Sequence, residues 1–145
     1  MYRIDRDTMF IMIAMIVAKR STCQRLKVGA VLVKDYRPIS TGYNGAPSGL
    51  PHCDEVGCEM ENGACVRTVH AEANAIAFAA KNGISTQGSI LYTTNAPCYT
   101  CAKLIINAGV SEVVFKTEYR REEGVNLLES CGIKVREYKK DSVLS

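Results

Sequence analysis

The sequence predicts one α/β domain, residues 1–145, in which a β-sheet is covered by helices. Strand-like runs alternate with helical segments along the chain, and glycine and proline separate them clearly. The chain has 145 residues, of which 47% are hydrophobic, so it can bury one core. The chain has only four prolines, and this composition argues against disorder.

The first half is predicted to begin with a helix and two strands. Asp5 can cap an apolar helix that extends to about Arg20. The runs Val28–Val33 and Ile39–Tyr43 are predicted strands. A loop rich in glycine, proline and cysteine follows, for which we expect no regular structure.

The second half is predicted to alternate helices with strands, which brings the number of strands to five. In chain order these are a helix from about His70 to Lys81 ended by Gly83, a strand at Ile90–Thr93, a helix at Cys98–Asn107 ended by Gly109, a strand at Glu112–Lys116, a helix at Glu122–Ser130 and a strand at Lys134–Tyr138.

Charge and composition argue against nucleic acid and membrane as partners. The formal net charge is only +3, and apart from Arg120-Arg121 and Lys139-Lys140 the basic residues are dispersed. Tryptophan is absent and phenylalanine numbers three, so stacking platforms for bases are scarce. The apolar run Met9–Val17 is too short to span a bilayer, which predicts a core helix instead. A small phosphate-bearing substrate fits this composition better.

The seven cysteines indicate a reducing compartment. An odd number of cysteines, some of them placed for metal binding, is unlike a secreted disulfide scaffold. No targeting segment is evident in the sequence. We therefore expect a cytoplasmic protein.

Two short motifs together predict a catalytic zinc site. His70-Ala71-Glu72 is followed, twenty-seven residues after His70, by Pro97-Cys98-Tyr99-Thr100-Cys101. One imidazole and two thiolates are suited to zinc, and three protein ligands leave a fourth position for water. Bound zinc lowers the pKa of water, and Glu72 could then transfer protons as general acid and base.

Each motif alone would permit a simpler interpretation. A single C-x-x-C can be a redox pair, half of a zinc ribbon or two buried thiols, and a single H-x-E usually lies on a solvated helix face. Pro97 suits a helix entrance whatever the function. Both motifs are predicted at helix N-termini, where the partial positive charge favours thiolates. The combination therefore favours catalysis.

The order H-x-E then P-C-x-x-C is typical of zinc-dependent base deaminases. The chain resembles the cytidine deaminase superfamily, and from Arg3 to Tyr138 most of all its deoxycytidylate deaminase branch. The resemblance implies a three-layer fold, with a central five-stranded mixed sheet and helices on both faces. Free-nucleoside deaminases typically carry cysteine where this chain has His70. The stretches that carry the resemblance are Lys27–Val31, Gly42–Gly45, His70–Ile76 and Cys98–Lys103.

The resemblance implies hydrolysis of dCMP to dUMP and ammonia, which would supply dUMP for thymidylate synthesis. Asn44 would hold the sugar and the backbone near Ala71 the pyrimidine edge. Arg25 and the pair Tyr119-Arg120 would hold the 5′-phosphate, although Arg120 could equally be an ordinary surface charge.

The resemblance also implies regulation and assembly. Family members are activated by dCTP and inhibited by dTTP, each triphosphate binding with Mg²⁺, and most of those regulated in this way are hexamers. Lys27, Asn44 and Gly45 are the candidate allosteric residues. The simpler alternative is that Gly42 and Gly45 permit a tight turn after a strand.

The loop at residues 44–69 contains three cysteines that predict a second, structural zinc. Cys53, Cys58 and Cys65 occur within thirteen residues, and a loop of this length needs a staple to be ordered. Relatives can hold an additional zinc through a cysteine at the position of Cys23, which makes Cys23 the expected fourth ligand and His52 the reserve. The alternative is a set of reduced, unpaired thiols.

Three other functions remain open at this point. The substrate could be another base, such as adenosine in transfer RNA, a riboflavin-pathway pyrimidine or free deoxycytidine. The chain could be a non-enzymatic zinc module that pairs Cys53 and Cys58 with Cys98 and Cys101, although His70 and Glu72 would then have no role. It could also be a competence-linked relative with a different cellular role.

Overall fold

The computed structural model describes residues 2–117 and 122–139, so the predicted substrate residues Tyr119 and Arg120 lie outside the described residues. The main sheet has five strands in the order β2-β1-β5-β6-β7. Its strands are β1 (Gly29–Lys34), β2 (Arg37–Tyr43), β5 (Ile90–Asn95), β6 (Glu112–Thr117) and β7 (Lys134–Glu137). The helices are α1 (Arg6–Ala18), α2 (Cys53–Val56), α3 (Ala71–Lys81), α4 (Tyr99–Asn107) and α5 (Glu122–Ser130).

The sheet is mixed, as the resemblance implied. Strand β1 pairs antiparallel with both β2 and β5, whereas β5, β6 and β7 run parallel to one another. Parallel neighbours require a crossover, and α4 and α5 are the helices that connect β5 to β6 and β6 to β7. The β5–α4 connection carries the P-C-x-x-C motif, so the crossover rule places this motif at the carboxyl edge of the sheet.

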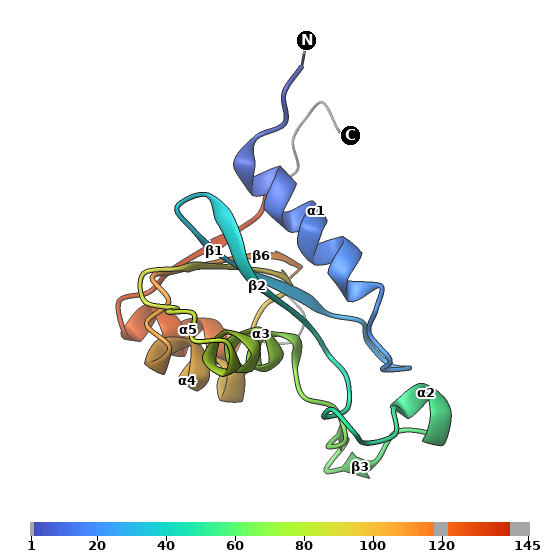
Figure 1. Cartoon of the computed structure of the whole chain (residues 1–145). Helices are drawn as coiled ribbons and strands as arrows, with labels where there is room; N and C mark the ends of the chain where they lie inside the picture. The colour runs from blue at the N-terminus through green and yellow to red at the C-terminus, as the bar shows by residue number, and fades with distance from the viewer. Residues whose placement is uncertain (1, 118–121, 140–145) are drawn as a thin grey trace.

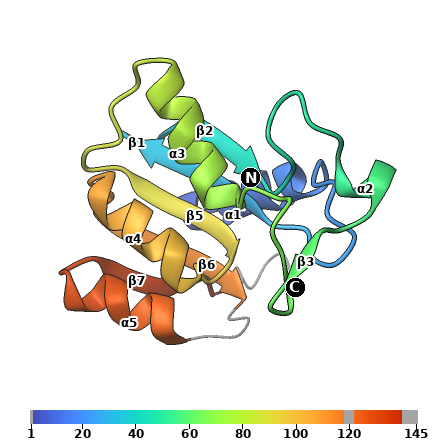
Figure 2. The same cartoon turned by 90° about the horizontal axis from the view of Figure 1, so that it is seen from below.

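Three layers result, with α1 on one face of the sheet and α3, α4 and α5 on the other (Figure 1). Successive strand residues point to opposite faces, so Val31 and Val33 pack toward α1 while Ala30 and Leu32 pack toward α3 and α4. Figure 2 shows α3, α4 and α5 side by side across the sheet. Both faces are therefore buried, and β1 is apolar at nearly every position because of it.

Two glycines allow helices to approach the sheet closely. A Cβ on Gly29 would lie 2.0 Å from the carbonyl oxygen of Ala14 in α1. A Cβ on Gly42 would lie 2.3 Å from the carbonyl oxygen of Ala71 in α3. Gly42 therefore permits helix–sheet packing at the start of α3, rather than the tight turn that was its simpler explanation.

The expected elements of the main domain are all present, with small differences at their ends. Asp5 caps α1 as predicted, since its carboxylate accepts a hydrogen bond from the Thr8 amide at 2.7 Å. Strand β2 begins at Arg37, two residues before the prediction, because it pairs with β1 up to the turn. Within the described residues, no helix has the length and apolar character needed to cross a bilayer.

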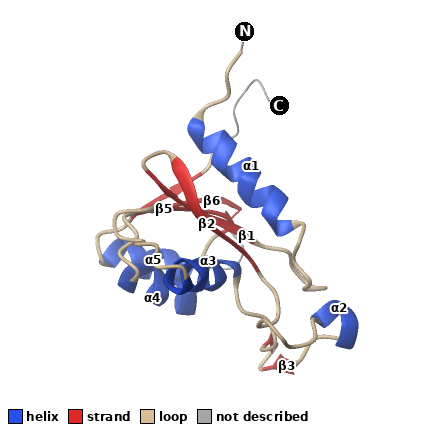
Figure 3. Cartoon of the chain, viewed as in Figure 1, coloured by secondary structure: helices blue, strands red, loops and turns tan. Residues whose placement is uncertain are grey.

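The prediction of an irregular 44–69 loop was wrong in part. The segment contains the short helix α2 and a small hairpin of β3 (Met60–Glu61) and β4 (Ala64–Cys65), visible apart from the main sheet in Figure 3. Gly45 and Val69 close the base of the segment by exchanging two backbone hydrogen bonds, of 3.2 and 2.8 Å. Strands of two residues are too short to give a periodic sequence pattern, so this hairpin was not foreseen.

Candidate metal centre and active site

The three predicted zinc ligands come from the N-termini of two adjacent helices. His70 is the N-cap residue of α3, and Cys98 is the N-cap residue of α4. Cys101 lies in the first turn of α4, and its amide donates a hydrogen bond to Cys98 Sγ at 3.5 Å. The two helix starts therefore present an imidazole and two sulfurs to the same point.

The spacing of the three donor atoms fits one tetrahedral zinc ion. His70 Nδ1 lies 3.5 Å from Cys98 Sγ and 3.4 Å from Cys101 Sγ. A zinc ion with ordinary bond lengths to nitrogen and sulfur separates such ligand atoms by about 3.5 Å in a tetrahedron. His70 and Cys98 are exposed whereas Cys101 is buried, so the cluster is open toward solvent on one side. Three candidate donors with one side open to solvent are what a catalytic zinc site would require.

Glu72 lies beside this cluster and is almost fully buried. Glu72 is only 5% exposed, and its carboxyl group is in hydrogen-bond contact with the Cys101 side chain. Burial raises the pKa of Glu72 above its usual range, because the charged carboxylate loses solvation. A carboxyl group with a raised pKa next to a metal site can both accept and return a proton.

The two sulfurs of this cluster favour a single negative charge between them. The thiol of Cys101 donates a hydrogen bond to Cys98, which together with His70 lowers the pKa of Cys98 to about 3. The same contact and burial raise the pKa of Cys101. A divalent cation in contact with both sulfurs would stabilise both as thiolates.

Two residues that the sequence did not single out contact the segments that carry the predicted ligands. Asn74, one turn after His70, donates from its side-chain amide to the carbonyls of Tyr43 at 2.8 Å and Val69 at 3.4 Å. A Cβ on Gly124 of α5 would lie 2.1 Å from the Pro97 carbonyl oxygen, so α5 packs directly on the segment that carries Cys98. A polar residue on the His70 side of an otherwise apolar helix was the available signal for Asn74.

A second cluster forms in the 44–69 segment. The sulfurs of Cys53, Cys58 and Cys65 all lie within 4.8 Å of one another, and Cys53 Sγ is 3.6 Å from Cys65 Sγ. Sulfurs bound to one tetrahedral zinc are about 3.8 Å apart. Burial raises the pKa of Cys53 to about 12. For Cys65 burial is outweighed by hydrogen bonds, first from the Arg67 amide, that lower the pKa to about 7.

The two expected additional ligands are not within this second group of mutually close atoms. Cys23 is buried and its sulfur accepts a hydrogen bond from the Arg25 amide at 3.4 Å. His52 Nδ1 lies 3.1 Å from Thr22 Oγ1. This contact holds the segment before Cys53 beside the segment that contains Cys23.

Asn44 is an expected substrate residue. Both the oxygen and the nitrogen of its side-chain amide form hydrogen bonds to the backbone. Its Oδ1 accepts from the Val28 amide at 2.8 Å and its Nδ2 donates to the Leu26 carbonyl at 2.7 Å. The residue is buried, at 7% exposure. Asn44 therefore fixes the approach to β1.

Arg25 and Lys27 are both exposed, whereas Ala71 is fully buried at the start of α3. The guanidinium of Arg25 donates to the Gly63 carbonyl at 3.1 Å, which joins its segment to the β3–β4 hairpin. Gly45 forms the bridge with Val69 described above. The structure thus places Arg25, Lys27, Asn44 and Gly45 on or against the segment that leads into β1.

Comparison with known proteins gives a clear family relation. Residues 4–117 match the model of the cytidine and deoxycytidylate deaminase zinc-binding region. ComE operon protein 2 of Bacillus subtilis is 40% identical over 145 residues, which cover 99% of this chain and 77% of that protein. The deoxycytidylate deaminase of Schizosaccharomyces pombe is 38% identical over 94% of this chain but only 45% of its own length.

A solved structure with the same fold carries nucleotides. It is the dCMP deaminase from the cyanophage S-TIM5 in complex with dCMP and dUMP, with a TM-score of 0.84 and 34% sequence identity. The alignment covers 95% of this chain and all of that one.

Proposed function

The chain belongs to the cytidine and deoxycytidylate deaminase family and is a deaminase, and from this premise we propose that its reaction is the hydrolysis of dCMP to dUMP and ammonia. The observation that carries the proposal is the open cluster of His70, Cys98 and Cys101 with the buried Glu72 beside it. The likeness to a dCMP deaminase that binds dCMP and dUMP supports this choice of substrate.

His70, Cys98 and Cys101 would hold the zinc ion, because their donor atoms have the spacing of three corners of a tetrahedron. When bound, zinc supplies a Lewis acid that makes water a nucleophile near neutral pH. Glu72 accepts a proton from the attacking water and delivers it to N3 of the pyrimidine. Glu72 then passes the remaining proton of the attacking water to the amino group, which leaves as ammonia.

The first turn of α3 is suited to hold the pyrimidine edge. His70 forms no side-chain hydrogen bond to the amides of that turn, although it occupies the N-cap position. The Ala71 amide is therefore available to an acceptor atom of a bound base, whereas the Glu72 amide is bonded to its own carboxylate. Glu72 lies in the same turn, which places recognition and proton transfer together.

The remaining substrate contacts are assigned to polar and cationic groups near this site. Arg25, Tyr119 and Arg120 would hold the 5′-phosphate, since guanidinium groups bind phosphate bidentately. Only one of the Arg25 nitrogens is bonded to Gly63, so its other N–H groups remain able to bind an anion. Asn44 would contact the deoxyribose through its remaining N–H or shape the loop that does so.

Regulation and assembly are further parts of the proposal. The triphosphates dCTP and dTTP, each with Mg²⁺, would bind near Lys27, Asn44 and Gly45 and respectively activate and inhibit. Because Asn44 bonds the backbone of Leu26 and Val28, a ligand at Lys27 could shift the entry to β1. The active form would be a homo-oligomer, as a hexamer, and its dUMP would serve thymidylate synthesis in the cytoplasm.

A second, structural zinc would bind Cys53, Cys58 and Cys65 and staple the 44–69 segment. Cys23 would become the fourth ligand by a local movement of its segment, to which the Thr22–His52 contact already joins the loop. The amides that donate to Cys65 support this role, because such bonds stabilise a metal-bound thiolate.

A substrate panel tests the choice of reaction. Ammonia release should be much faster from dCMP than from deoxycytidine, a riboflavin-pathway pyrimidine or the adenosine of a transfer-RNA anticodon. Addition of dCTP or dTTP in the same assay tests regulation. A preference for any other substrate in the panel would contradict the proposal, while leaving the family membership intact.

A further inference from the structure

Asn74 has no part in the chemistry proposed above, yet it forms hydrogen bonds on both sides of a predicted metal ligand. Its backbone amide donates to the His70 carbonyl at 2.9 Å. Its side-chain amide donates to the Val69 carbonyl at 3.4 Å. These two carbonyls belong to the two planar peptide groups that flank the Cα of His70. Asn74 therefore contacts both peptide groups around His70.

The side-chain nitrogen of Asn74 also joins this region to the central sheet. The same Nδ2 donates to the carbonyl of Tyr43, the last residue of β2, at 2.8 Å. A side-chain amide nitrogen carries two protons, so one is available for each carbonyl. Gly45 also donates to the Val69 carbonyl, at 3.2 Å, but that bond closes the base of the 44–69 segment. Asn74 is thus the contact that holds the peptide group before His70 against both α3 and β2.

The backbone of His70 determines the directions in which its imidazole can point. As the N-cap residue it has a φ of -67° and a ψ of 154°, and its side chain bonds no amide of the first turn. Side-chain rotamers depend on these two angles, so holding both neighbouring peptide groups restricts the orientation of the ring. In the observed orientation Nδ1 lies 3.5 Å from Cys98 Sγ and 3.4 Å from Cys101 Sγ.

We propose that Asn74 is the positioning residue that aims the imidazole of His70 at the metal site. It acts through the backbone of His70 and needs no contact with the metal or the base. Groups that orient a metal ligand from outside the coordination sphere typically change metal affinity by about 10- to 100-fold when they are removed. The inference rests on the proposed zinc site, but not on which base the enzyme deaminates.

Ser40 makes a comparable contact one residue further along α3. Its hydroxyl donates to the Ala75 carbonyl at 2.6 Å, and the residue is buried. Ser40 and Asn74 therefore both join β2 to α3, but the Ser40 bond does not reach the peptide groups around His70. Ser40→Ala is the matched control, because it removes a bond between the same two elements without releasing the ligand.

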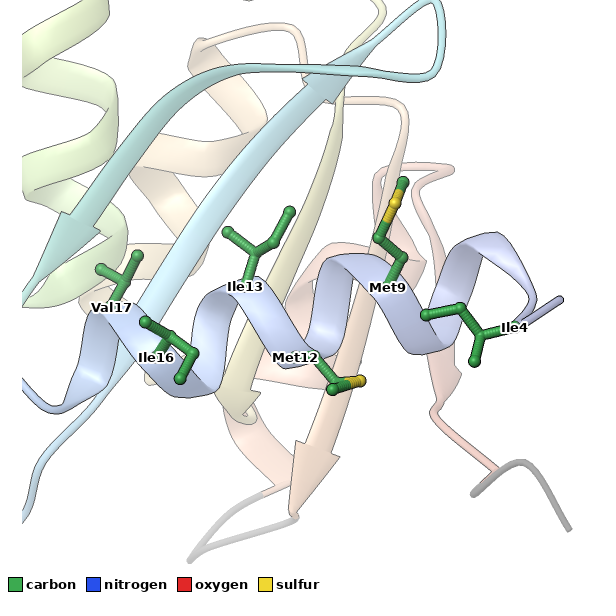
Figure 4. A pocket seen from close by; sticks show the side chains of 6 residues that line it. All are labelled: Ile4, Met9, Met12, Ile13, Ile16 and Val17. Atoms are coloured by element: carbon green, nitrogen blue, oxygen red, sulfur yellow. The ribbon is translucent and has the colours of Figure 1, made fainter. Parts of the chain in front are cut away.

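The apolar groove of the chain does not compete for zinc. It follows α1, which lies on the opposite face of the sheet from α3, and it is lined by Ile4, Met9, Met12, Ile13, Ile16 and Val17 (Figure 4). None of these six lining residues is a histidine, a cysteine or a carboxylate. Substitution of Asn74 leaves this groove untouched, so a change in zinc binding cannot originate there.

Zinc competition with a chelator, followed by NMR of the His70 ring in the full chain, tests the proposal. The chain has two histidines, so the ring signals of His70 can be separated from those of His52. Asn74→Leu keeps a similar side-chain volume but removes the donor, and the apparent dissociation constant of zinc at His70 should rise by about tenfold. Asn74→Ala should show the same change, and its smaller side chain cannot crowd α3.

The control separates positioning from general stability. Ser40→Ala should lower the thermal unfolding midpoint by about 3 °C, as should Asn74→Ala, while the zinc dissociation constant of the Ser40 variant stays within about twofold of the unsubstituted value. An unchanged constant in both Asn74 variants would overturn the proposal. Equal weakening in Ser40→Ala would also overturn it, because general loosening of α3 would then explain the effect. His70 ring signals that do not respond to zinc in the unsubstituted chain would contradict the zinc site itself, and the inference with it.

Discussion

The two cysteine clusters contain similar chemical groups but are built differently. His70, Cys98 and Cys101 are held by the first turns of α3 and α4, which pack on the central sheet. Cys53, Cys58 and Cys65 are held by one short helix and a two-stranded hairpin at the side of the domain. We infer that rigid elements would position a reactive site, whereas a local zinc staple would need only nearby thiols.

The two clusters also differ in their solvent exposure and in the chemical groups around them. The helix-borne cluster has an imidazole, an exposed side and the buried carboxylate of Glu72. The hairpin cluster offers only sulfurs, and Cys53 is completely buried. We therefore expect substitutions in the first cluster to change turnover, and those in the second to change stability.

The largest effect is expected from Glu72→Gln. Turnover of dCMP should fall by about a thousandfold or more, since general acid–base catalysis typically contributes that much. Zinc content, measured by mass spectrometry of the metal, should be equal to that of the unsubstituted chain. Glu129→Gln, at an exposed site on α5, is the matched control and should retain full activity. Retained turnover in Glu72→Gln would assign the proton transfer to another group.

Cys53→Ser is the corresponding change in the second cluster. The zinc content should fall from two ions per chain to one, and the free energy of unfolding by about 3 kcal/mol, as expected for a site saturated at a hundred times its dissociation constant. Turnover should change by less than tenfold. Cys131→Ser, which removes an exposed free thiol, should change none of these quantities. One zinc per chain in both the variant and the unsubstituted protein would remove the second site.

Gly42→Ala should be more harmful than a glycine substitution in the hairpin. Its Cβ would clash with the Ala71 carbonyl oxygen at 2.3 Å, so α3 must move and stability should fall by about 2–3 kcal/mol together with turnover. Gly63→Ala has open space but a φ of 80°, which costs about 1 kcal/mol and should spare turnover. Chemical denaturation and steady-state assays measure both. Similar losses of turnover in the two variants would contradict the division between the clusters.

Asp7→Asn provides a baseline, because Asp7 joins α1 to the sheet away from both clusters. The hydrogen bond from Arg136 lowers the pKa of Asp7 below its ordinary value of 3.8, so the pair stabilises the fold above that pH. The stabilisation, about 1 kcal/mol for this part-exposed pair, should disappear as the pH falls through the folded-state pKa. Unfolding curves from pH 7 to pH 2 should converge for the two proteins. A constant difference would show that ionisation of Asp7 is not the cause.

The smallest effect is expected for Thr93→Val, just before the P-C-x-x-C segment. Thr93 is fully buried and, among the described residues, its hydroxyl is the one buried side-chain group that lacks a hydrogen-bond partner. Its removal should therefore be neutral or slightly stabilising. Thr94→Val is the matched comparison and should cost about 1 kcal/mol, because Thr94 Oγ1 accepts from the Gly29 amide and donates to Asn95. A large loss of stability in Thr93→Val would indicate an ordered water at this hydroxyl.

Much of the fold follows from local sequence patterns. The apolar runs at β1, β5 and β6 are typical of strands buried on both faces, and the glycines at positions 83 and 109 end α3 and α4 with positive φ angles of 67° and 79°. The close approach of His70, Cys98 and Cys101 was predictable because metal chemistry restricts both residue type and spacing.

Contacts between distant segments were not predictable in this way. Asn44 was singled out as a sugar ligand, and no local pattern indicated that its amide also bonds the backbone of residues that precede it by sixteen and eighteen positions. The close approach of Gly42 to α3 and of Gly124 to Pro97 likewise depends on how separate elements pack. No periodicity reports such pairs, since each depends on three-dimensional packing.

An anomalous difference map at the zinc absorption edge, from crystals of the full chain, tests the central claim most directly. We predict a peak in contact with His70 Nδ1 and the sulfurs of Cys98 and Cys101, and with no fourth side chain. A fourth protein ligand at that peak, or no peak at this position, would contradict the assignment of an open catalytic zinc site.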